Sequence, residues 1–189
     1  YKMYSENSAN GLRPANSANV LDKWIMARLN ELVKVVTEEM DKYNTVKAGR
    51  PIKDFIDDLS TWYVRRSRDR FKIGNEEDKQ SAIATLREVL LTLSKIMAPF
   101  TPFMAEKMYL ELGGELESVH LEKWPQINDK MINDKLIEQM IQARKVVEMG
   151  LALRAEAGIK VRQPLSKFSI FPDKVRDPAF HRDNFQFSK

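Results

Sequence analysis

The chain has 189 residues, of which 43% are hydrophobic and 31% are charged, and its formal net charge at pH 7 is +4. This composition is typical of a globular protein, and no apolar run approaches the roughly 20 residues that span a bilayer, so we expect a cytoplasmic protein without a membrane helix or signal peptide. Cysteine is absent, which excludes disulfides and thiolate chemistry. The two histidines, His120 and His181, lie far apart in the sequence, and we expect no metal site.

The positive charge is concentrated in one segment. Between Thr45 and Lys72, eight basic residues stand against four acidic ones, so this segment carries the whole net charge of +4. An excess gathered in one place is typical of proteins that bind polyanions, whereas evenly mixed charge mostly serves solubility.

The first part of the chain predicts a linker followed by a long helix. Residues 1–18 are rich in serine, asparagine and alanine, which is typical of a linker. From Leu21 to Tyr43, apolar residues recur every three or four positions, the spacing of one face of an amphipathic helix. Asn19 is placed to cap this helix, and Asp22 suits the positive end of its dipole.

A second helix is expected from about Thr45, which is a possible cap, and Pro51 either kinks this helix or restarts it as a first-turn proline. It should continue into the basic stretch, with its inward face formed by Ile52, Phe55, Ile56, Leu59, Trp62 and Tyr63.

Two more helices are expected before the paired glycines Gly113 and Gly114. The first runs from about Glu76 to Ala98 and ends at "APFTPF". The second starts at Pro102 and stops at the two glycines. Its inward residues are expected to be Phe103, Met104, Met108 and Leu112.

The rest of the chain predicts a fifth helix and a short β-like extension. The stretch "SVHLEKWP" suggests a short extended segment, and a helix marked by Leu136, Ile137, Met140, Val147 and Leu151 should end at Gly158. From Ile159 to Ile170 the apolar spacing is that of a strand, and Pro164 favours a turn or an edge position. The predicted fold class is therefore all-α, an up-and-down bundle of about five helices with a short β-like C-terminal extension.

The basic stretch divides into two groups when it is placed on an ideal helix of 100° per residue. Arg66 and Arg70 fall within the apolar sector, and we interpret them as structural partners of carboxylates on a neighbouring helix. Arg65, Arg68 and Lys72 fall on the opposite side. They form either a solvated helix end, where cations favour the dipole, or a surface that follows a nucleic-acid backbone without reading its sequence.

Five segments of the chain resemble, in order, the helical anticodon-binding domain of isoleucyl-tRNA synthetases, which are class I aminoacyl-tRNA synthetases. They are "DKWIMARLNELV", "RPIKDFIDDLSTWYVRRSRDRF", "LSKIMAPFTPFMAEKMY", "SVHLEKWP" and "GIKVRQPL", and together they extend over roughly residues 20–165. Of these, "WYVRRSR" and "IKVRQPL" favour the isoleucyl enzymes over the valyl and leucyl ones.

The resemblance implies a helical domain over residues 19–158 that binds the anticodon stem and loop of tRNA(Ile). Because Arg65, Arg68 and Lys72 fall on the side of the helix away from the apolar face, they are the expected tRNA contacts. Residues 1–18 would link it to an absent catalytic domain, and residues 159–189 would begin a truncated C-terminal module that contains β-structure. The parent protein would be an ATP-dependent isoleucine–tRNA ligase that uses ATP and Mg²⁺.

This chain itself is expected to carry no catalytic site and no cofactor. The family's ATP-site signatures, His-Ile-Gly-His and Lys-Met-Ser-Lys-Ser, do not occur in it. We expect His120 to pack or hydrogen-bond beside Trp124 rather than to act in catalysis, because no nucleophile or ordered carboxylate adjoins it. The expected partner is tRNA rather than DNA or a membrane, and the expected state is a monomer. The alternatives are the corresponding domain of a valyl or another branched-chain synthetase, and a helical protein-interaction module.

Overall fold

The computed structural model describes residues 19–73, 75–165, 167–170 and 185–188, so the expected linker over residues 1–18 lies outside the described residues. The chain forms two compact units, one ending at Asp134 and the other beginning at Lys135. None of the helices in the described ranges combines the length and the apolar character that a membrane crossing requires.

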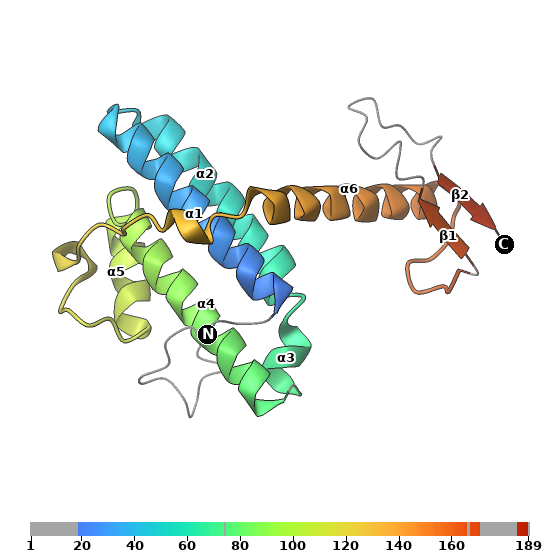
Figure 1. The fold of residues 1–189 in the computed structure, drawn as a ribbon, viewed down its shortest axis with the longest axis horizontal. Helices are drawn as coiled ribbons and strands as arrows, with labels where there is room; N and C mark the ends of the chain where they lie inside the picture. Colours follow the sequence, from blue (N-terminus) through green and yellow to red (C-terminus); the bar gives the residue numbers. More distant parts are fainter. Residues whose placement is uncertain (1–18, 74, 166, 171–184, 189) are drawn as a thin grey trace. The chain divides into compact units, whose positions relative to one another are not determined.

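The first unit begins with a helical hairpin, in which α1 (Val20–Asp41) lies along α2 (Thr45–Asp57) (Figure 1). The predicted cap is present, because Asn19 Oδ1 accepts a hydrogen bond of 2.9 Å from the Leu21 N–H. Tyr43, which was expected on the inward face, is instead 92% exposed. Its φ of 57° is left-handed, and the N–H groups of Tyr43 and Asn44 close the end of α1 on the carbonyls of Met40 and Glu39.

After α2 the backbone leaves regular α-helix geometry. The cap of α2 is Asn44 rather than Thr45, and the helix runs through Pro51. It passes into a π-helical segment, η2 (Asp58–Val64), then a three-residue turn, and then the short helix α3 (Arg68–Lys72). The continuous second helix expected from the sequence is therefore interrupted just before its basic residues.

The two helices that follow, α4 (Glu76–Met97) and α5 (Pro102–Glu111), complete the bundle (Figure 1). Both begin at the predicted residues and end within two residues of the predicted positions, and Gly113 closes α5 with a φ of 67°. The predicted inward face of α5 is wrong in part, because Phe103 is 91% and Met104 64% exposed. The buried residues of α5 are Ala105 and Tyr109, followed by Leu112 just after the helix.

The core of this unit is formed by side chains of α1, α2, η2, α3, α4 and α5, and it confirms the predicted all-α bundle. Its largest fully buried side chains are Trp24, Tyr63, Tyr109 and Phe55. The stretch predicted to be extended instead contains a short 3₁₀ turn, η3 (Val119–Leu121), flanked by extended residues, and a second 3₁₀ turn, η4 (Asp129–Met131), lies against α1.

The second unit consists of α6 (Asp134–Glu156) and two short strands, β1 (Lys167–Ile170) and β2 (Phe185–Ser188), which pair antiparallel. Gly158, with a φ of 66°, closes α6 as predicted. The strand does not begin at Ile159, because the residues before Pro164 form a turn whose carbonyls accept hydrogen bonds from Arg154. The boundary between the compact units falls at the first residue of α6. The sequence predicts a domain boundary after residue 158, and that boundary stays a prediction.

Candidate nucleic-acid interface

Four exposed cations lie close together in sequence where η2 passes into α3: Arg65, Arg66, Arg68 and Lys72, here called the cationic segment. None of the four forms an ion pair with another residue that the structure describes. In α3, Arg68 and Lys72 are four residues apart and so share one side of the helix. The three cations expected to be outward are therefore exposed, and a fourth joins them.

The π-helical turn explains why Arg66 is exposed. In η2 the Arg65 N–H donates to the Ser60 carbonyl, a step of five residues that places one more residue in the turn than an α-helix would. The positions after it are displaced by about one residue, or roughly 100°. Ser67, fully buried, takes the inward position that the ideal helix assigned to Arg66, so the prediction of an inward, ion-paired Arg66 is wrong.

Instead, Arg66 lies over an aromatic ring. Its guanidinium carbon is 5.3 Å from the centroid of the Trp62 indole, which is within the range of a cation–π contact. Trp62 is half-buried and belongs to η2, so the ring is fixed by the bundle while the guanidinium remains at the surface.

Arg70 forms the inward ion pairs expected of it and joins three helices. Its Nη1 and Nη2 donate to the two carboxylate oxygens of Asp22 in α1 at 2.8 and 2.9 Å. Its Nε and Nη2 donate to Asp78 in α4 at 2.8 and 2.6 Å. The buried Asp22 also accepts a bond of 2.8 Å from the Tyr63 hydroxyl. This cluster attaches α3 to the bundle and so fixes the base of the cationic segment.

The electrostatics of the cluster favour a charged Arg70 and a neutral Tyr63. Burial disfavours the charged guanidinium, but its hydrogen bonds to Asp22 and Asp78 outweigh burial and raise the pKa of Arg70. Burial, and then the Asp22 carboxylate, raise the pKa of the Tyr63 hydroxyl. The hydrogen bonds from Arg70 lower the pKa of Asp78.

A second ion pair fixes the other end of η2. Asp58, the first residue of the π-helical segment, is buried and accepts a bond of 3.0 Å from Arg28 Nε in α1. The Arg28 guanidinium also pairs with Glu31 on the same helix. The π-helical segment that precedes the cationic residues is therefore attached to α1 at two points, through Asp58 and Tyr63.

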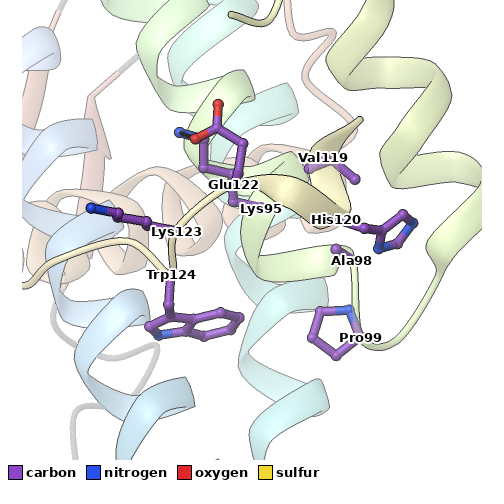
Figure 2. A pocket seen from close by; sticks show the side chains of 8 residues that line it. All are labelled: Lys95, Ala98, Pro99, Val119, His120, Glu122, Lys123 and Trp124. Carbon is purple, nitrogen blue, oxygen red and sulfur yellow. Dashed lines mark ion pairs between the residues drawn. The ribbon is translucent and has the colours of Figure 1, made fainter. Parts of the chain in front are cut away.

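A shallow hollow of about 200 Å³ lies elsewhere on the same unit, between the end of α4 and the residues around η3 (Figure 2). Lys95 forms an ion pair with Glu122, with an N–O distance of 3.0 Å. In Figure 2 these two side chains lie at one end of the view and the rings of Trp124 and Pro99 at the other. His120 lines this hollow together with Trp124, but it is exposed rather than packed into the core.

Glu122, at the edge of the hollow, is held by two neighbouring side chains. The Tyr109 hydroxyl donates to Glu122 at 2.6 Å, and this bond, together with Lys95, holds the pKa of Glu122 below its usual range. Within the described ranges, no group of three or more His, Cys, Asp or Glu side chains could hold a metal ion. The cationic segment, with four exposed cations that form no ion pair with another described residue, is the stronger candidate for a site that binds an anionic partner.

The sequence matches the family model described as the anticodon-binding domain of tRNA ligase over residues 22–169. The chain belongs to this family. The match extends from the first turn of α1 into β1 and includes the cationic segment.

Relatives of this anticodon-binding domain include three bacterial isoleucine–tRNA ligases. The Streptomyces coelicolor protein is 46% identical over 156 residues, which is 80% of this chain and 14% of the relative. The Clostridium acetobutylicum protein is 44% identical over 186 residues, 94% of this chain and 18% of the relative. The Deinococcus radiodurans protein is 45% identical over 150 residues, 79% of this chain and 14% of the relative. The chain thus spans less than a fifth of the length of these relatives.

Proposed function

We propose that this domain binds the anticodon stem and loop of an isoleucine tRNA on behalf of an isoleucine–tRNA ligase. The match to the anticodon-binding family over residues 22–169 carries this proposal, and the exposed cations of the cationic segment supply the chemistry. The relatives reported above are named isoleucine–tRNA ligases, which favours isoleucine over valine as the amino acid.

The proposed contacts are Arg65, Arg68 and Lys72 with RNA phosphates. Guanidinium groups fit phosphate oxygens with two parallel hydrogen bonds, and an ammonium binds them as a point charge. Each phosphate that is neutralised releases condensed counterions, so the affinity depends on salt. These contacts would position the RNA, because phosphates carry no sequence information.

The aminoacylation step is proposed to reside in other parts of the ligase, with ATP and Mg²⁺ bound there and no cofactor bound by this domain. The domain is proposed to act as a monomer in the cytoplasm. Isoleucine-dependent ATP–pyrophosphate exchange by the purified chain, above a contaminant control, would refute the claim that it is catalytically inert.

The experiment that tests the proposed function locates binding on the tRNA. The chain is titrated with a labelled isoleucine tRNA, and two unlabelled hairpins are added as competitors: the anticodon arm and the acceptor arm. We expect the anticodon hairpin to displace the tRNA and the acceptor hairpin to do so only at much higher concentration. Equal displacement by the two hairpins would contradict anticodon-arm binding, as would an absence of tRNA binding.

A further inference from the structure

Phosphate binding does not require the cation–π contact of Arg66 with Trp62. Exposed Arg and Lys side chains bind phosphates without an aromatic ring beneath them, as proposed above for Arg65, Arg68 and Lys72. Arg66 instead has its guanidinium carbon 5.3 Å from the Trp62 ring centroid, and the Trp62 side chain is half-buried in the bundle.

We propose that Arg66 is a stacking platform for an unpaired RNA base, presented by Trp62 and set outward by the π-helical turn of η2. This inference rests on the proposed function. Unpaired bases in RNA loops are recognised on aromatic faces and on the planes of Arg guanidinium groups. The Arg66 guanidinium carbon lies over the indole and Arg66 is an exposed residue, so a base can approach the guanidinium from the side turned away from the ring.

The geometry also reduces the entropy that binding costs. A free Arg side chain loses much of its rotamer freedom when it is ordered by a ligand. Arg66 is already restrained by its contact with Trp62, and the ring is restrained by η2, which is attached to α1 through Asp58 and Tyr63. A base that stacks there extends an existing arrangement, while Arg65 and Arg68, on either side of it in sequence, hold the adjacent phosphates.

The test is a double-mutant cycle between the protein and the RNA, measured with the full 189-residue chain. Wild type and Arg66→Lys are titrated with a hairpin that carries the anticodon stem and loop of an isoleucine tRNA, and with the same hairpin whose loop nucleotides are abasic. Lysine keeps the charge but has no planar face. We expect Arg66→Lys to bind the intact hairpin about tenfold more weakly than wild type, and both proteins to bind the abasic hairpin alike.

Arg68→Lys is the matched control, because it makes the same substitution two residues away at an exposed cation in α3. It should change the affinity for the two hairpins by the same factor, as expected of a phosphate contact. Trp62→Leu, checked for folding by circular dichroism, should reproduce the selective loss of Arg66→Lys because it removes the support and leaves the charge.

The outcomes separate this inference from the proposed function. If Arg66→Lys changes the affinity for the intact and the abasic hairpin by the same factor, or changes neither, Arg66 is not a base platform and the inference is overturned, while tRNA binding stands. If wild type binds neither hairpin in a salt-dependent way, the proposed function fails and the inference fails with it.

Discussion

The buried cluster around Asp22 predicts that replacing Arg70 destabilises the domain more than replacing any cation of the cationic segment. Arg70→Met keeps an apolar stem but removes both hydrogen bonds that Arg70 donates to Asp22, whose side chain is only 2% exposed. Breaking a buried ion pair by removing one partner costs about 3 to 5 kcal/mol. Because the Arg70 side chain itself is 13% exposed, we expect the lower end, about 3 kcal/mol.

The second partner of Arg70 adds little to this magnitude. Asp78 is 39% exposed, and an ion pair at such a site contributes about 1 kcal/mol or less. For a domain of this size, a loss of about 3 kcal/mol lowers the melting temperature by about 10 °C.

Thermal and urea unfolding followed by circular dichroism measure the effect. Arg68→Met is the control, because Arg68 is exposed and forms no ion pair with another described residue, and its melting temperature should stay close to that of wild type. The double variant Asp22→Asn with Arg70→Met should recover at least about 1 kcal/mol relative to Arg70→Met, since no buried charge is left unpaired. Equal losses in Arg70→Met and Arg68→Met, or no recovery in the double variant, would refute the reasoning.

Three other predictions concern single positions. Burial and the Asp22 carboxylate raise the pKa of the Tyr63 hydroxyl above about 10, the value of a tyrosine in an unfolded chain. The hydroxyl therefore contributes its full stability below about pH 10, and this contribution is lost as the pH rises further. When urea unfolding is measured across that pH range, Tyr63→Phe should lose less stability than wild type. A Cβ at Gly114 would lie 2.0 Å from Tyr109 Cζ, so Gly114→Ala should lower the free energy of unfolding by about 3 kcal/mol. Gly158→Ala should lower it by only about 1 kcal/mol, because the space around Gly158 is open and only its left-handed φ of 66° disfavours alanine. Tyr43→Gly should raise the melting temperature by a few degrees, which corresponds to about 0.5 to 1 kcal/mol, because glycine adopts the left-handed φ of 57° without steric cost. A lower melting temperature would contradict this account of the end of α1.

Much of the bundle could be predicted from the sequence because its signals are local. The apolar spacing and Asn19 indicated the start of α1, and the glycines Gly113 and Gly158 indicated the ends of α5 and α6. The inward face of α5 could not be predicted from residue size alone. There the core accepts Ala105 and Tyr109, and the Tyr109 hydroxyl is satisfied by Glu122 and the Leu116 N–H, while the larger apolar Phe103 remains exposed.

Only the part of the candidate site that depends on local sequence signals could be predicted. A period of 100° per residue placed Arg65, Arg68 and Lys72 outward, but no pattern in the stretch signals a step of five residues, so Arg66 was placed on the wrong side. The spacing of four residues places Trp62 and Arg66 on the same side of an ideal helix, and in the structure the two side chains do meet, although both positions lie nearer the surface than that helix predicts. The partners of Arg70 depend on tertiary contacts, because Asp22 lies 48 residues away in the chain.

The salt dependence of tRNA binding tests the central claim most directly. An isoleucine tRNA is titrated at several salt concentrations with wild type and with the triple variant Arg65→Gln, Arg68→Gln and Lys72→Gln. A control variant changes three exposed lysines elsewhere to Gln: Lys23, Lys34 and Lys107. The first triple variant should bind more weakly, and its plot of log affinity against log salt should be shallower by roughly one unit for each phosphate that the protein no longer neutralises. The control should keep the wild-type slope. The same affinity and slope in wild type and the first variant, with the helical content unchanged, would contradict the claim that this segment binds the tRNA.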